Sequence, residues 1–239
     1  MKEVSESAVQ AIVRRAQERF EVERRRLLIS TDRLFGALMV VQWIFAIGIA
    51  VVFSPYAWEG RERAVHPHVW TAVLLGGAIS GLPLLLVALR PGAVLTRHVV
   101  ASAQMLWSAL LIHLTGGRIE THFHVFASLG ILAGYRSWPV LATATVVVAG
   151  DHIVRGLLWP ESVYGIVNPE WWRFLEHAGW VVFANAFLVV QCLRGMRDMR
   201  AIAERGAELE ALAENEWTKS SVLERPAEEP AYAAADARN

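Results

Sequence analysis

The 239-residue sequence has a single cysteine, no net charge and few charged residues for its length. The lone Cys192 excludes an intramolecular disulfide framework and a Cys-rich zinc module. Lys and Arg together number 23, as do Asp and Glu, so the chain lacks the positive field that nucleic-acid binding needs, and we expect no nucleic-acid partner. Charged residues make up 19% of the chain and hydrophobic residues 54%. Soluble domains carry roughly a quarter charged residues, so this composition argues against an ordinary soluble protein.

Familiar catalytic motifs are also missing. The sequence has no GxxxxGK[ST], GxGxxG, GxSxG or HExxH motif, which removes the usual grounds for predicting a nucleotide-binding protein, a serine hydrolase or a zinc protease. The HxxxH and HxxHH boxes of histidine-rich membrane hydroxylases and desaturases are absent as well. No internal repeat of the transporter kind is evident. The sequence therefore gives no direct reason to predict an enzyme or a transporter.

What the chain does have is apolar blocks long enough to cross a bilayer. About 20 residues cross the hydrocarbon core as a helix, and a helix is required because lipid offers the backbone no hydrogen-bond partners. We predict an all-α polytopic bundle of about six transmembrane helices over residues 34–193, in contact with the lipid bilayer. The expected spans are 34–53, 69–89, 94–114, 119–135, 138–154 and 174–193. Five spans remain an alternative if residues 119–154 form one broken or re-entrant unit.

The basic residues indicate the orientation of these spans. Cytoplasmic segments of membrane proteins are enriched in Lys and Arg, and both ends of this chain are basic. The residues concerned are Lys2, Arg14, Arg15, Arg19, Arg24, Arg25, Arg26 and Arg33 before the first span, and Arg194, Arg197, Arg200 and Arg205 after the last. Both termini are therefore expected in the cytoplasm, with the chain in a bacterial inner membrane. Trp58, Trp70, Trp138, Trp159, Trp171 and Trp172 fall near the span ends, as an interfacial aromatic belt would.

Three segments lie outside the predicted bundle. Residues 1–33 read as a basic, amphipathic helix that lies on the inner leaflet or extends the first span into the cytoplasm. Residues 194–216 continue the last span as a signalling-type helix, and their apolar positions follow 3-4 spacing over about two heptads, so a homodimer through this helix is one option. Those positions are Met199, Ile202, Gly206, Leu209 and Ala213. Residues 217–239 read as a disordered tail.

Histidines and carboxylates gather at one depth in this topology, near the outer side. Ionisable groups at such a depth usually face the bundle interior, and imidazole with carboxylate is a natural ligand set for transition metals. We therefore predict a copper, zinc or iron site, supported by Arg118 and Arg155, from His113, Glu120, His122, His124, Asp151, His152, Glu176 and His177. Glu120 and His124 share a helix face while His122 points nearly opposite, so all three can bind one ion only if the backbone before His122 is still loop.

Other interpretations of the same residues stay open. Asp151 and Arg155, four residues apart, can form a simple ion pair, and the whole set can be a proton-sensitive polar network or unrelated interface residues. Bis-histidine haem is a rival cofactor, using His113 with His124, His152 or His177. His66 and His68, which flank Pro67 in a loop, are left out of the expected site. Interhelical hydrogen bonds are expected from Gln42, Gln104, Ser108 and Asn185.

One stretch resembles a known kind of protein. The segment GGRIETHFHVFASLGILAGYRSWPVLATATVVVAGDHIVRGLLWPESVYG, residues 116–165, is similar to the membrane input region of bacterial sensor histidine kinases, hybrid kinases and chemoreceptor-like proteins. The later RFLEHAGWVVF and MRAIAERGAELEA runs extend the resemblance over roughly residues 30–215. It implies a membrane bundle that feeds a cytoplasmic signalling helix, with the sensing site at the paired HFH, DH and EH elements. The pattern departs downstream, where no PAS, kinase, diguanylate cyclase or chemoreceptor module is recognised.

The expected function is therefore sensory. Ligand binding at the histidine and carboxylate cluster would shift helix packing, and the last span would pass the change to residues 194–216, which would act in a dimer or on a cytoplasmic signalling partner. A membrane metalloenzyme or a haem-binding membrane protein that uses the same cluster is the alternative. A catalytic output domain is not recognisable, which favours the sensor over the enzyme.

Overall fold

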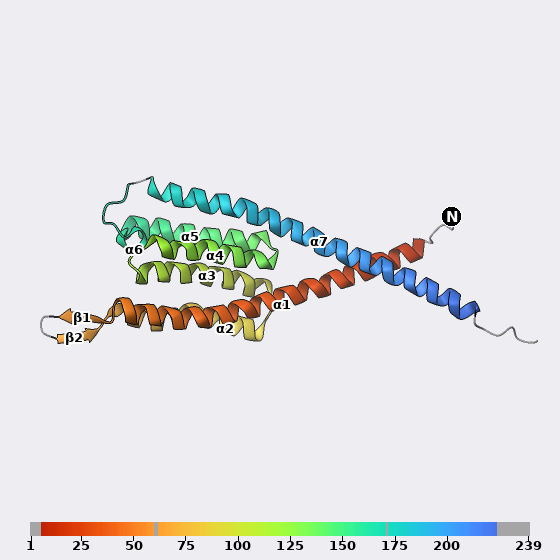
Figure 1. Cartoon of the computed structure of the whole chain (residues 1–239), viewed down its shortest axis with the longest axis horizontal. Helices are drawn as coiled ribbons and strands as arrows, with labels where there is room; N and C mark the ends of the chain where they lie inside the picture. Colours follow the sequence, from red (N-terminus) through yellow and green to blue (C-terminus); the bar gives the residue numbers. More distant parts are fainter. Residues whose placement is uncertain (1–5, 60–61, 171, 224–239) are drawn as a thin grey trace, which may run out of the picture. The chain divides into compact units, whose positions relative to one another are not determined.

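The computed structural model describes residues 6–59, 62–170 and 172–223 (Figure 1). The chain divides into two compact units, one formed by Met1–Phe20 with Arg200–Asn239 and the other by Glu21–Met199. Two long helices, α1 (Glu6–Phe53) and α7 (Arg173–Leu223), contribute residues to both units.

The larger unit is a helix bundle with one short hairpin. After α1, strands β1 (Tyr56–Glu59) and β2 (Glu62–Val65) pair antiparallel, with Tyr56 opposite Val65. The chain then forms α2 (Pro67–Leu89), α3 (Val94–Leu114), α4 (Ile119–Leu132), the 3₁₀ turn η1 (Ala133–Tyr135), α5 (Trp138–Leu158), the short α6 (Glu161–Tyr164) and α7. The predicted all-α class is confirmed for the described residues, apart from the hairpin.

Helix α3 is the centre of this bundle and contacts α2, α4, α5 and α6. Its side chains Trp107, Met105 and Ile112 are completely buried. The Trp107 indole N–H donates to Ser80 Oγ of α2 at 3.1 Å. A Cβ atom at Gly76 would stand 2.8 Å from the Trp107 ring, so glycine at that position lets α2 approach this large side chain. The core thus forms around one buried helix rather than around the most apolar ones.

Four of the described helices are long and apolar enough to cross a membrane: α1, α2, α5 and the segment Arg173–Asn215 of α7. The chain is accordingly a multi-pass membrane protein. Helices α3 and α4 are not among the four. Since α3 is covered by its neighbours, it can carry the polar Arg97, Gln104 and His113, which lowers its hydropathy. Six spans and the cytoplasmic placement of both termini stay predictions.

The turn between α4 and α5 fastens the two long helices. Tyr135 donates its hydroxyl hydrogen to the buried Asp32 carboxylate of α1 at 2.6 Å, and Gly92 N–H donates to the same carboxylate. The next residue, Arg136, has left-handed backbone (φ 51°) and donates to the Gly195 carbonyl of α7 at 2.9 Å. Two adjacent residues therefore hold α1 and α7 at one level of the bundle.

The smaller unit is a pair of helical segments from the two ends of the chain. Ala16 and Phe20 of α1 are buried together with Ala203 and Ala207 of α7. Arg15 pairs with Glu214 at 2.8 Å, Arg19 pairs with Glu210, and the Arg200 guanidinium lies 5.0 Å from the centre of the Phe20 ring.

The face of α7 that packs here carries Ala203 and Ala207. It differs from the face expected from the heptad positions, of which Ile202 and Leu209 are exposed. The expected helix 194–216 is part of α7, which extends to Leu223. The expected disordered tail therefore begins inside a helix, and its residues 224–239 lie outside the described part of the chain, as do residues 1–5 of the basic segment and Trp171 of the aromatic belt.

Candidate functional site

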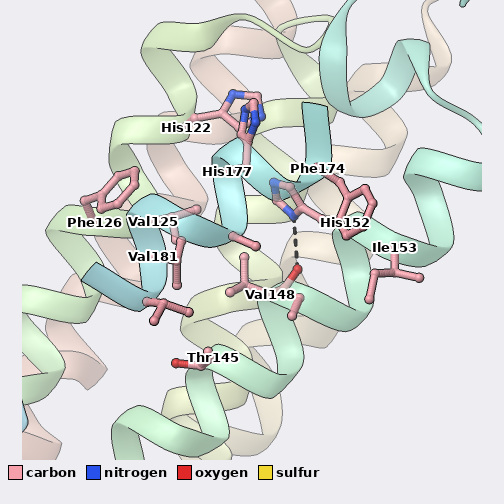
Figure 2. A pocket seen from close by; sticks show the side chains of 13 residues that line it. His122, Val125, Phe126, Thr145, Val148, His152, Ile153, Phe174, His177 and Val181 are labelled. Carbon is pink, nitrogen blue, oxygen red and sulfur yellow. Dashed lines mark hydrogen bonds between the residues drawn. The ribbon is translucent and has the colours of Figure 1, made fainter. Parts of the chain in front are cut away.

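Three histidines from three helices meet beside one cavity. His122 of α4, His152 of α5 and His177 of α7 have ring centres 5.7 Å (His122–His152), 5.2 Å (His122–His177) and 6.2 Å (His152–His177) apart (Figure 2). We call these residues the three-histidine group. Their convergence follows from the fold, because α4, α5 and α7 bring the HFH, DH and EH elements to the same level.

The same hydrogen bond orients each ring of the group. In every case Nδ1 lies 3.0 Å from the carbonyl oxygen four residues earlier on its own helix, that is Arg118, Val148 and Arg173. A carbonyl can only accept, so Nδ1 carries the hydrogen and Nε2 keeps a free lone pair. His122 Nε2 is buried and has no hydrogen-bond partner. The group therefore offers Nε2 lone pairs, with tautomers fixed by the backbone.

The cavity next to the group is small and apolar. Its volume is about 160 Å³, and its walls include Val125, Phe126, Val148, Phe174 and Val181. Figure 2 shows these side chains around the space below the imidazoles. An apolar cavity of about 150 Å³ is large enough to hold a benzene-sized molecule.

The Asp151 carboxylate and the Arg155 guanidinium lie next to His152. Asp151 Oδ2 lies 3.3 Å from His152 Nδ1, but both Asp151 oxygens accept hydrogen bonds from Arg155, at 2.7 and 2.6 Å. Arg155 also donates to Ser162 Oγ of α6 at 2.8 Å. Asp151 thus forms the ion pair that its spacing from Arg155 allowed, and it contacts the group through His152.

His113 belongs to a second set of rings. Its Nδ1 is 2.9 Å from Ser162 Oγ, and its ring centre lies 5.1 Å from His68 and 4.9 Å from Trp159. His68 in turn lies 4.4 Å from His66. From the sequence, His66 and His68 were expected to be loop residues outside the site. Because α2 and α3 are antiparallel neighbours, the start of α2 lies beside the end of α3. An antiparallel pairing of these two predicted spans could therefore have indicated that His68 lies near His113.

His124 occupies a third environment, inside the bundle. Its Nε2 is 2.8 Å from Gln42 Nε2 of α1, and its Nδ1 is 2.8 Å from Ser108 Oγ of α3. Both ring nitrogens are thereby engaged. The interhelical hydrogen bonds expected from Gln42, Gln104, Ser108 and Asn185 are confirmed, since Gln104 donates to Ser128 and Asn185 to Thr145.

The two expected glutamates lie at the edge of these sets. Glu120 is exposed and pairs with Arg118 at 3.4 Å. Glu176 lines a second hollow together with His122 and His177 of the three-histidine group. Since α4 is regular from Ile119 onward, Glu120, His122 and His124 point into three different surroundings, and the loop needed for all three to bind one ion is not formed. Within the described residues, no group of three or more His, Cys, Asp or Glu side chains could hold a metal ion as placed.

Comparison with known proteins gives one similarity. The chain is 33% identical over 145 residues to Transducer protein Htr8 of Halobacterium salinarum, a match that covers 55% of this chain and 22% of that protein. The chain therefore corresponds to about a fifth of the length of this curated relative. No protein-family model matches the sequence, and no solved structure matches it. The chain is thus a membrane protein that is similar to part of a transducer.

Proposed function

We propose that the chain is a sensory input module of a bacterial inner membrane, and that a transition metal ion (copper, zinc or iron) binds at the three-histidine group. The observation that carries this proposal is the repeated Nδ1–H to carbonyl bond, which leaves three Nε2 lone pairs beside one cavity. Histidines that bind metals almost always donate their other ring N–H in this way. The similarity to a transducer protein supports the sensory role.

The three imidazole rings could hold one metal ion after a small movement of His152 and His177 toward each other. Three imidazoles that hold one zinc ion, with each nitrogen about 2.0 Å from it, have ring centres about 5 Å apart. The His122–His177 distance of 5.2 Å is already close to that value, whereas His152–His177 is 6.2 Å. Ligation would therefore require His152 and His177 to approach each other by about 1 Å. The apolar cavity would leave room for a further small ligand at an open coordination position.

That closure is also how a signal would start. His152 lies on α5 and His177 on α7, so bringing their rings together moves α7 against α5. The apolar part of α7 is the least buried of the four candidate spans, at 6% against 33% for α1, so few side-chain contacts oppose a shift of its outer half. A ligand shifts such an equilibrium by its difference in affinity for the two arrangements. The continuous helix would carry the movement to residues 194–216, which would act in a homodimer or on a cytoplasmic signalling partner.

Metal content of matched variants tests the site. The full chain, purified in detergent, is dialysed separately with Zn²⁺, Cu²⁺ or Fe²⁺ and analysed for bound metal beside His177→Ala and His124→Ala. We expect one metal ion per chain, lost in His177→Ala and kept in His124→Ala, since His124 bonds to Gln42 and Ser108 instead. Equal metal content in the two variants, or no bound metal in the folded wild-type protein, would overturn the metal site.

The same purified protein separates the alternatives. A Soret band in its absorption spectrum would replace the metal ion with bis-histidine haem. Turnover of a substrate by the purified chain without any partner would favour a membrane metalloenzyme over a sensor. For the sensory role, a spin-label pair on α5 and α7 should report a shorter distance after metal addition, with no change in His177→Ala. An unchanged distance in metal-loaded protein would contradict the sensory mechanism.

A further inference from the structure

A long surface groove, here called the furrow, runs between α2 and α3 and begins at the rings of His68, His113 and Trp159. Near His66, His68 and His113 it has a volume of about 700 Å³. It continues as a second hollow of about 340 Å³ beside Pro83 and His98, and both share the side chains Ile79 and Leu106. From Pro67 to Pro83 helix α2 rises by about 24 Å. The furrow is therefore long enough for an extended lipid tail.

The wide end of the furrow is lined by rings and by groups that form hydrogen bonds. His68, His113 and Trp159 meet edge to face at centre distances of 5.1 and 4.9 Å. Ser162 Oγ lies in the same lining, and His68 Nδ1 is buried without a hydrogen-bond partner. Rings of this kind contact a flat molecule well, and imidazole and hydroxyl groups can both donate and accept hydrogen bonds. This end suits a flat head group with polar substituents.

The charges of the lining exclude an anionic head group. Arg155 directs Nε and one terminal nitrogen to Asp151, and its other terminal nitrogen to Ser162. The guanidinium is thus neutralised by Asp151, and four of its five N–H donors are used, so a phosphate or carboxylate that took its place would have to break a buried ion pair. A neutral molecule faces no such cost.

We propose that this furrow binds an isoprenoid quinone or quinol, with the ring among His68, His113 and Trp159 and the tail along Ile79 and Leu106 toward Pro83. A quinone combines the required features: it is neutral, flat, bears oxygen atoms that exchange hydrogen bonds with imidazole and hydroxyl groups, and carries a long apolar tail. The site is separate from the three-histidine group, but Arg155 and Asp151 connect the two through Ser162 and His152.

The test measures quinone held by the full-length protein. Detergent-purified chain is extracted with organic solvent, the quinone is quantified per protein, and binding of a short-tailed benzoquinone is followed by native mass spectrometry. Ile79→Trp fills the furrow, and Leu85→Trp places the same ring on an exposed position of the same helix outside the lining. We expect about one quinone per chain, at least about tenfold weaker binding in Ile79→Trp, and unchanged binding in Leu85→Trp.

A second variant keeps the test decisive if Ile79→Trp fails to fold. His113→Leu removes the head-group contact and should weaken binding in the same direction, while His177→Ala, in the three-histidine group, should bind as the wild type does. Equal binding by Ile79→Trp and Leu85→Trp, co-purification of phospholipid alone, or no uptake of the benzoquinone by folded protein would each overturn the proposal. Loss of metal with retention of quinone in His177→Ala would show that the two sites are independent.

Discussion

Asp151 and Arg155 form a two-pronged ion pair, with hydrogen bonds of 2.7 and 2.6 Å, and their side chains are 13% and 20% exposed. The same carboxylate lies 3.3 Å from His152, and the same guanidinium donates to Ser162, which contacts His113. One ion pair therefore stands between the three-histidine group and the rings of the furrow. This position makes it the first target for mutagenesis.

Replacing Arg155 by alanine should destabilise the bundle. The variant leaves the largely buried Asp151 carboxylate without its partner, and removal of one member of a buried pair costs about 3–5 kcal/mol. Thermal unfolding in detergent measures the change. Arg118→Ala is the matched control, because its pair with Glu120 is exposed and should contribute less than about 1 kcal/mol. Equal unfolding temperatures for the two variants would show that the Asp151–Arg155 pair is open to water.

Tyr135→Phe should weaken the attachment of α1. The substitution removes one hydroxyl, and with it the 2.6 Å hydrogen bond to the completely buried Asp32 carboxylate. A hydrogen bond to a charged group contributes about 1.5–3 kcal/mol. Chemical denaturation followed by circular dichroism should report a loss of that size. Tyr56→Phe, at an exposed tyrosine of the hairpin, should leave stability unchanged, and a similar loss there would contradict the assignment.

Two neighbouring glycines should differ in their tolerance of alanine. Gly116 and Gly117 both have left-handed backbone, with φ of 70° and 75°, and an L-residue there costs about 1–2 kcal/mol. A Cβ atom at Gly117 would also lie 2.2 Å from the backbone nitrogen of Gly165, whereas one at Gly116 would meet nothing within 4 Å. Gly117→Ala should therefore unfold at clearly lower temperature than Gly116→Ala. If both unfold together, the close approach of the two loops is not present in solution.

Gln42→Leu should affect stability but not metal content. The variant leaves His124 Nε2 without its 2.8 Å partner inside the bundle, and an unsatisfied buried polar group costs about 1–3 kcal/mol. Gln191→Leu, on the exposed surface of α7, is the control and should be nearly neutral. Denaturation and metal analysis of the same samples check both halves of the prediction. Metal loss in folded Gln42→Leu would place His124 in the metal site after all.

The helices were predictable because their apolar blocks are long and separated by turn residues. The expected span 94–114 coincides with α3, and the expected boundary at Arg136 and Ser137 is the turn between η1 and α5. The sequence predicts that this segment crosses the membrane, yet α3 is not among the four described helices that are apolar enough to do so. A helix enclosed by others can be polar without meeting lipid, and enclosure depends on the order of helices in the bundle.

The sequence indicated which residue types form the candidate site, but not which of the histidines lie together. His122, His152 and His177 do converge, yet His113 and His124, which the sequence placed at a similar depth, lie in other surroundings. Depth follows from position along a helix, whereas grouping depends on the rotation of each helix about its axis and on which helices are neighbours. His68 was missed for the same reason, since its partner is 45 residues away in the sequence and adjacent in the fold.

The α4–α5 turn has a consequence for how the two long helices can move. Tyr135 and Arg136 are consecutive, and one holds Asp32 of α1 while the other holds Gly195 of α7. A displacement of either helix at this level must be shared by the other through two residues of backbone, or else break a hydrogen bond. Within the larger unit the two long helices are thus mechanically linked, so a shift of α7 at Gly195 also pulls on α1 at Asp32.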